Sequence, residues 1–201
     1  NDRAHRAAVE LGIMTLQNLV ASGTVSDTDR ARLQTELART VTHGLTAVSI
    51  NEKNYQNWLT LAQLYQNLAG VGVEGAYEAG KSAFERARTE NPTNPLPSLR
   101  LAQLEILAGN TNVAYVLLDE ALSKKPDFAE AHFIRSQLKA QEGDLIAAEE
   151  SALSAVRLAP QDPLAWYNVG AILYAQGAYA KAIPPLEQAV FLRPEYANAL
   201  F

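Results

Sequence analysis

The sequence predicts an all-α solenoid of antiparallel helix pairs, and three observations support this fold class. First, a proline recurs every 34 residues, at positions 92, 126, 160 and 194. Second, three further columns keep the same period: Ala87, Ala121, Ala155 and Ala189; Gly109, Gly143 and Gly177; and Ala114, Ala148 and Ala182. Third, the segments between these positions carry apolar residues three and four apart, the spacing of an amphipathic helix. A repeat of this length is typical of stacked two-helix units.

Each unit is predicted to contain two helices separated by a short break. In the unit that begins at residue 129, the helices are expected over residues 129–142 and 145–158. Gly143 suits the left-handed position that ends a helix, and Asp144 suits the N-cap of the next one. The pair Asp162-Pro163 places an N-cap residue before a proline at the first helical position. The alanines at positions such as 121 and 155 are small enough for paired helices to approach closely.

The repeat divides the chain into six predicted segments. Residues 1–54 form a degenerate, enlarged hairpin with helices over 2–21 and 27–50. Residues 55–94 form a unit with an insertion around residues 70–75. Three units of standard length follow at 95–128, 129–162 and 163–196, and residues 197–201 begin a further unit. No initiator methionine and no capping helix are present, so we expect the natural chain to extend beyond both ends.

These residues resemble the tetratricopeptide repeat (TPR) family, whose pattern is W-x2-L-G-x2-Y followed by A-x3-F, A and P within 34 residues. The best match is the unit 163–196. It has Trp166, Val169, Gly170 and Leu173 in its first helix, and Ala182, Leu186, Ala189 and Pro194 in its second. The unit that begins at residue 55 has Trp58, Leu61, Ala62 and Tyr65. The resemblance implies a right-handed superhelix and a non-catalytic scaffold for protein–protein interaction.

A narrower resemblance concerns a bacterial subgroup of TPR regions. The strings at residues 54–58 (NYQNW), 72–77 (GVEGAY) and 91–95 (NPTNP) are similar to repeats that follow the membrane spans of O-antigen ligase-like and polymerase-like proteins. This resemblance implies a soluble accessory domain of a larger, membrane-bound protein of envelope glycan assembly. It favours the extracytoplasmic side of a bacterial membrane over the cytoplasm.

In the TPR family, the first helices of successive units line a concave groove that binds a peptide or a helix. If the first residue of each unit is position 1, the groove comes mainly from positions 2, 5, 9, 12 and 13. The residues predicted to line it here are Leu59, Gln63, Leu99, Arg100, Gln103, Phe133, Gln137, Tyr167, Asn168 and Tyr174. Lysines that would clamp a carboxylate are missing from these positions. An apolar stripe flanked by amides instead suits an amphipathic helix or an extended peptide.

Two alternatives to this groove remain open at the level of sequence. Four of the residues can equally pack between neighbouring first helices, namely Leu59, Leu99, Phe133 and Tyr167. The glutamines at positions 63, 103 and 137 can form a solvated face. A third possibility is homotypic assembly, in which an apolar face of the last helix stacks on a second copy of the chain.

No catalytic constellation, cofactor site or metal site is expected. The chain has no cysteine, and its three histidines, His5, His43 and His132, are widely separated in the sequence. His132 occupies a helix-packing position, so a satisfied, half-buried side chain is expected there. No HExxH, GxSxG or P-loop spacing occurs. The net charge of −5 argues against a nucleic-acid partner. No apolar run approaches the roughly 20 residues that span a bilayer, so direct membrane insertion by this segment is not expected.

Overall fold

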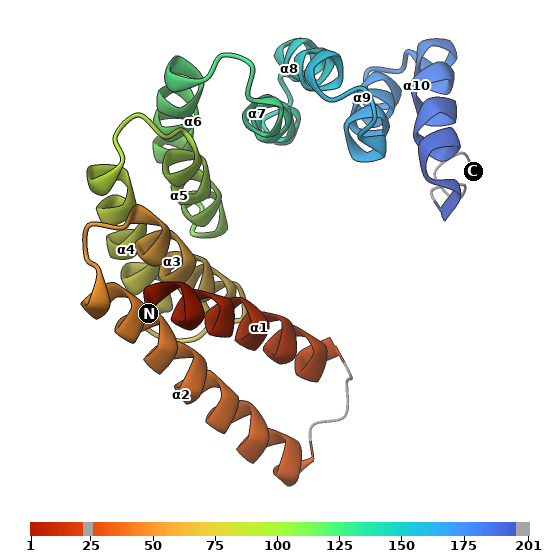
Figure 1. Ribbon diagram of the computed structural model, residues 1–201. Coiled ribbons are helices and arrows are strands. Elements are labelled where there is room, and N and C mark those ends of the chain that lie inside the picture. Colours follow the sequence, from red (N-terminus) through yellow and green to blue (C-terminus); the bar gives the residue numbers. More distant parts are fainter. Residues whose placement is uncertain (22–25, 196–201) are drawn as a thin grey trace. The chain divides into compact units, whose positions relative to one another are not determined.

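The computed structural model describes residues 1–21 and 26–195, which form ten α-helices and no strand (Figure 1). Residues 197–201, where the sequence predicts the start of a further repeat, lie outside the part of the chain that the structure describes. The helices divide between two compact units, residues 1–117 and residues 118–201. The boundary falls within α6 (Thr111–Lys124), so the first half of this helix belongs to the first unit.

The first unit contains α1 (Asp2–Ala21), α2 (Asp27–Ile50), α3 (Tyr55–Gly70), α4 (Ala76–Glu90) and α5 (Leu96–Leu107). The helices α1 and α2 pack as one antiparallel pair, and α3 and α4 pack as the next. The first helices α1, α3 and α5 also contact one another in order, so they form one layer. The helices predicted over residues 2–21 and 27–50 are present with these bounds.

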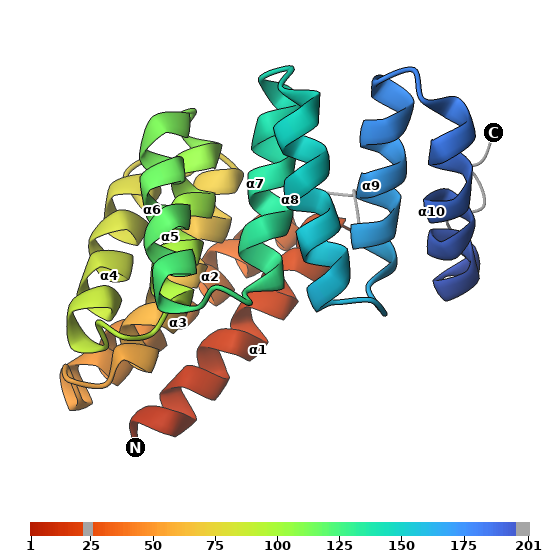
Figure 2. The ribbon, with the colours of Figure 1, turned by 90° about the horizontal axis from the view of Figure 1, so that it is seen from above.

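The second unit contains α7 (Ala129–Gln141), α8 (Leu145–Leu158), α9 (Pro163–Ala175) and α10 (Tyr179–Leu192). Figure 2 shows α7 beside α8, and α9 beside α10. Gly143, between α7 and α8, has a φ of 83°. This left-handed conformation favours glycine and ends α7 where the sequence predicts. The Asp144 carboxylate accepts a hydrogen bond from the backbone N–H of Ala147 at 3.2 Å, which confirms the predicted cap of α8.

Small residues of the repeat lie where paired helices approach each other. The alanines of the two recurring columns are all buried, with at most 2% of their surface exposed; they are Ala87, Ala121, Ala155, Ala189, Ala114, Ala148 and Ala182. Gly170 of α9 faces Leu186 of α10. A Cβ at residue 170 would lie 2.5 Å from the Leu186 Cγ and 3.4 Å from the Ala182 carbonyl oxygen. The absence of a side chain at Gly170 therefore sets how closely α9 and α10 can pack.

The insertion predicted around residues 70–75 lengthens one hairpin. The helix α3 has 16 residues, whereas α7 and α9 have 13 each, so α3 gains almost one turn. Gly72 and Gly75 of the following turn have φ values of 79° and 74°. The chain can reverse there because glycine tolerates positive φ.

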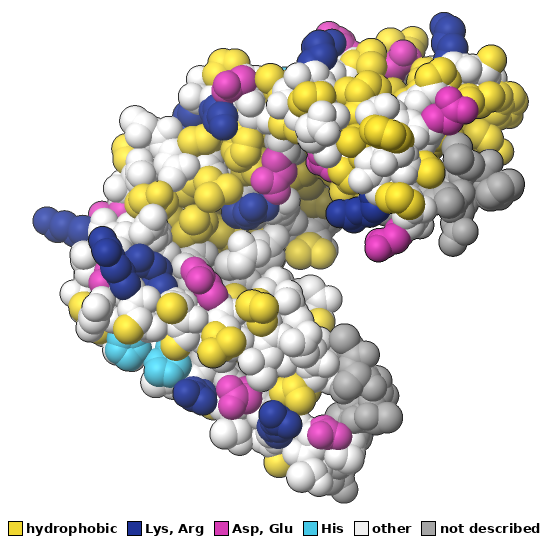
Figure 3. Space-filling view, turned by 45° about the vertical axis from the view of Figure 1, so that its right-hand side comes forward, with side chains coloured by type: hydrophobic (Ala, Val, Ile, Leu, Met, Phe, Trp, Pro, Cys, Tyr) yellow, Lys and Arg dark blue, Asp and Glu magenta, His cyan; other side chains and the backbone are white. Residues whose placement is uncertain are grey.

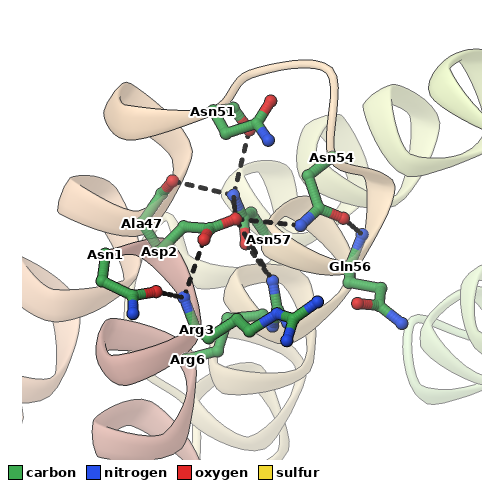
Figure 4. A network of polar contacts seen from close by, with 9 residues as sticks. All are labelled: Asn1, Asp2, Arg3, Arg6, Ala47, Asn51, Asn54, Gln56 and Asn57. Carbon is green, nitrogen blue, oxygen red and sulfur yellow. Dashed lines mark hydrogen bonds and ion pairs between the residues drawn. The ribbon is translucent and has the colours of Figure 1, made fainter.

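A polar cluster around Asn57 holds the beginning of α1 against the α2–α3 connection (Figure 4). The buried Asn57 amide donates hydrogen bonds to the backbone oxygens of Ala47 (2.8 Å) and Asn51 (2.9 Å). Its oxygen accepts a hydrogen bond from the Arg6 guanidinium at 2.7 Å. Asn54 donates to the Asp2 carboxylate, and this bond makes the largest contribution to a lowered pKa of Asp2. Since the polar atoms of Asn57 are satisfied internally, the cluster fixes α1 in one register.

We predict that Gly170→Ala destabilises the protein by about 1–3 kcal/mol, because the new methyl group must displace the Leu186 side chain between α9 and α10. The free energy of unfolding from urea titrations followed by circular dichroism measures this effect. The matched control is Gly70→Ala at the end of α3, where an added Cβ meets nothing within 4 Å. The control should be neutral or slightly stabilising, since alanine favours the helix. Equal destabilisation by both variants would contradict the role given to Gly170.

Candidate binding surface

The predicted groove residues of the second unit share one face of the first helices α7 and α9. Tyr167 and Tyr174 are seven residues apart, so they lie on the same side of α9 two turns apart. Both are accessible, with 39% and 63% of their surface exposed. On α7, Gln137 is exposed and Phe133, one turn earlier, is half-buried. The helices α7 and α9 contact each other. We call the set formed by Phe133, Gln137, Tyr167 and Tyr174 the tyrosine face.

Two further contacts define the edges of the tyrosine face. The Asn168 amide donates a hydrogen bond to the Ser136 hydroxyl at 2.5 Å, which links α9 to α7. Asn168 therefore positions the two helices. At the other edge, the ring of Tyr179 on α10 meets that of Tyr174 edge-on, with 5.0 Å between ring centroids. Sequence reasoning missed Tyr179, because it lies in a second helix and outside the groove positions of the family.

The predicted residues of the first unit are less accessible. Leu99 is completely buried in α5, so it belongs to the core and does not offer its side chain to a ligand. The prediction that Leu99 lines a groove is therefore wrong, and for this residue the packing alternative is correct. Leu59 is half-buried on α3. The Gln63 amide donates to Gln66 at 3.2 Å, and the Arg100 guanidinium donates to the half-buried Gln103 at 2.8 Å.

An apolar cavity of about 300 Å³ lies between α1, α2, α3 and the turn that follows α3. Leu16 and Ile13 of α1, Leu33 and Leu37 of α2, and Leu64 of α3 line it. Val71 and Val73 of the inserted turn complete its wall. The sequence predicted the insertion but not this cavity, because the cavity depends on how the long α1–α2 hairpin packs on α3.

A hydrogen bond from a ring nitrogen to the backbone carbonyl oxygen six residues earlier recurs at the beginning of α3, α7 and α9. The Trp166 indole donates to the carbonyl oxygen of Pro160 at 2.9 Å, and the Trp58 indole donates to that of Glu52 at 2.7 Å. At the equivalent position, Nε2 of His132 lies 3.0 Å from the carbonyl oxygen of Pro126. Since a carbonyl only accepts, His132 carries its proton on Nε2. This satisfied histidine is the one that the sequence predicts.

A buried carboxylate joins α4 to α5. Glu105 is fully buried, and it accepts hydrogen bonds from the Tyr77 hydroxyl (2.8 Å) and the Asn110 amide (2.7 Å). The Lys81 ammonium lies 3.0 Å from its other oxygen. Burial raises the pKa of Glu105, but the bonds from Asn110, Tyr77 and Lys81 outweigh burial, so the pKa of this carboxyl is lowered. The Glu105 cluster has a structural role, because all its partners are neighbouring elements of the fold.

Comparison with known proteins identifies the repeat. Two sequence profiles described as tetratricopeptide repeat match residues 74–141 and 141–197, which together make up more than half of the chain. The chain belongs to the tetratricopeptide repeat family. TPR domains are in general scaffolds for protein interaction.

One curated relative is the "Tetratricopeptide repeat and J domain-containing co-chaperone DNJ1" of Cryptococcus neoformans, which is 30% identical over 96 residues. The match covers 48% of this chain but only 18% of that protein.

Solved structures agree on the fold. The thermophilic TPR protein TTC0263 of Thermus thermophilus superposes with a TM-score of 0.67 at 18% identity, covering 98% of both chains. YrrB, described as "a TPR protein with an unusual peptide-binding site", gives a TM-score of 0.59 at 22% identity, over 83% of this chain and 82% of its own. The predicted all-α TPR solenoid is thereby confirmed. Within residues 1–21 and 26–195, no helix is long and apolar enough to cross a membrane.

We predict that stability decreases as the pH falls from about 5 toward 3, partly through Glu105. A carboxyl whose pKa is lowered in the folded state stabilises the protein above its unfolded pKa of about 4.3. This contribution is lost as the pH falls through the lower folded value. Glu105→Gln should cost about 1–3 kcal/mol at pH 7, because it weakens a buried, charge-assisted cluster. It should also flatten the acid dependence of urea unfolding.

The matched control is Glu74→Gln, which alters an exposed carboxylate in the same unit. It should leave both stability and its pH dependence close to those of the wild type. An unchanged acid dependence in Glu105→Gln would show that other carboxyls, such as Asp2 with its lowered pKa, account for the whole effect.

Proposed function

We propose that this chain is a non-catalytic scaffold that binds a peptide or an amphipathic helix on the tyrosine face of α7 and α9. The observation that carries the proposal is the exposure of Tyr167 and Tyr174 beside Gln137 and Phe133 on adjacent first helices. Tyrosines are enriched in protein interfaces, because they combine a large apolar ring with a polar end. An exposed glutamine amide can bond a peptide backbone.

Similar proteins lend support to this proposal. The related protein of Cryptococcus neoformans is named as a co-chaperone. The structural neighbour YrrB is described as having a peptide-binding site. In the first unit, we propose that Leu59, Gln63, Arg100 and Gln103 contribute a more polar surface for a partner. Leu99 takes no part in it.

We also propose boundaries for the repeats. An enlarged hairpin at 1–54 is followed by repeats at 55–94, 95–128, 129–162 and 163–196. The recurring bonds of Trp58, His132 and Trp166 support this division, since each lies at the fourth position of its unit.

Peptides selected from a random display library against the whole chain provide the test. Tyr167→Ala combined with Tyr174→Ala should weaken a selected peptide at least tenfold, because truncating two central tyrosines removes about 1.4 kcal/mol or more. Fluorescence anisotropy with a labelled peptide measures the affinity.

The control variant is Ile146→Ala on the second helix α8, where 82% of the side chain is exposed. It should leave the affinity within twofold. If Ile146→Ala weakens the peptide and the double tyrosine variant does not, the binding surface is the face of the second helices, and the proposal is wrong.

A second candidate function is that of an accessory domain in a larger, membrane-bound protein of bacterial envelope glycan assembly. The strings at residues 54–58, 72–77 and 91–95 favour it. They lie in the α2–α3, α3–α4 and α4–α5 connections and their edges. A native protein that proves to have no membrane-spanning segment would contradict this candidate.

Self-association is a third candidate, and the surface of α10 favours it. Ile183 and Phe191 of this helix expose 52% and 79% of their surfaces. Such apolar side chains suit stacking against a second copy. A strictly monomeric mass by light scattering at high concentration would contradict it.

A further inference from the structure

Two histidines that are distant in the sequence meet between the first two helices. His5 of α1 and His43 of α2 place their Nδ1 atoms 2.9 Å apart, with 5.1 Å between ring centroids. Both side chains are half-buried, so solvent reaches them. Figure 3 shows two histidine side chains next to each other at the molecular surface. The binding surface described above does not use this pair.

The distance between the two Nδ1 atoms fits two ligands of one metal ion. Metal–imidazole bonds are about 2.0–2.1 Å long. Two such bonds at a right angle, as in square-planar or tetragonal coordination, separate their nitrogens by about 2.9 Å. Tetrahedral coordination with the same bonds requires about 3.3 Å. A separation of 2.9 Å is also that of an N–H···N hydrogen bond between the two rings, so a metal ion would replace this bond, and the choice of ion rests on affinity.

We propose that His5 and His43 form a two-histidine clip for Cu(II) on the α1–α2 hairpin. We propose Cu(II) over other ions because it binds nitrogen ligands most tightly among the divalent first-row metals. Among residues 1–21 and 26–195, no group of three or more metal-binding side chains occurs. In this proposal the two histidines are the only protein ligands, and water completes the coordination of the ion.

The surrounding structure holds the two helices in place before any metal binds. Arg6, next to His5, donates to the Asn57 oxygen, and the Asn57 amide donates to Ala47, one turn after His43. Asn57 thus ties together the ends of α1 and α2 that carry the two histidines. Farther along the pair, Gly12 of α1 lies against the buried Thr40 of α2. Binding costs less entropy when both ligands are already positioned.

A partly polar pocket lies next to one of the two histidines, His43. A pocket of about 160 Å³ is lined by His43 together with Glu36, Arg39, Thr40 and Thr15. Its wall is partly polar, so it can hold water molecules next to His43. Ala8 and Leu11 of α1 form the apolar part of this wall.

The test is a titration of the whole chain with Cu(II) at pH 7.5, followed by isothermal calorimetry and by electron paramagnetic resonance of the bound ion. We expect one ion per chain and a spectrum with two imidazole nitrogens. His5→Ala and His43→Ala should each weaken binding at least tenfold. His132→Ala, whose imidazole already bonds the Pro126 carbonyl, should leave the affinity within twofold.

The decisive variant is His43→Ala, because copper bound by the amino terminus and His5 would not involve α2. If this variant binds Cu(II) as tightly as the wild type, the proposal is wrong. It is equally wrong if the wild type shows no binding at 100-fold molar excess of Cu(II), since the pair is then only an N–H···N hydrogen bond. Circular dichroism checks that each variant is folded. If His43→Ala is not, His43→Gln replaces it, because an amide keeps the polarity but is a poor copper ligand.

Discussion

The close approach of two helices within each pair is the constraint on which the other features depend. The buried alanines of the repeat place only methyl groups between the paired helices, and Gly170 places none, so the backbones can come together. A hairpin packed this closely presents its larger side chains to the neighbouring hairpins, where they form the core. The same packing turns Tyr167 and Tyr174 outward on α9, since Val169, Ile172 and Leu173 occupy the inner side of this helix.

The recurring positions explain why the fold could be predicted from the sequence. Periodic alanines, the glycine at 143 and the cap at 144 are local signals, and each acts within one turn or one hairpin. The resemblance to the TPR family then supplied the expected handedness of the superhelix and the positions of the residues expected to line its groove. The length of α3 was partly predictable as well, because the extra residues interrupt an otherwise constant period.

The site was predicted less completely, because exposure depends on contacts between elements. Leu99 and Tyr167 occupy the same position of their units, yet one is fully buried and the other is 39% exposed. The tyrosine hydroxyl favours a partly exposed position, but the contacts of each helix with its neighbours decide the outcome. Glu105 shows the same limit, since its burial is tolerated only because Tyr77, Lys81 and Asn110 converge on it from α4 and the next turn. The meeting of His5 and His43 likewise follows from the packing of α1 on α2, not from any local motif.

The ring-to-carbonyl bonds of Trp58, His132 and Trp166 have a consequence for how the chain folds. Each joins residues only six positions apart, so forming it costs little chain entropy. Each also lies at the connection where one hairpin turns into the next. Each bond can therefore form within its own connection without any contact between distant parts of the chain, so the geometry of each connection is set locally.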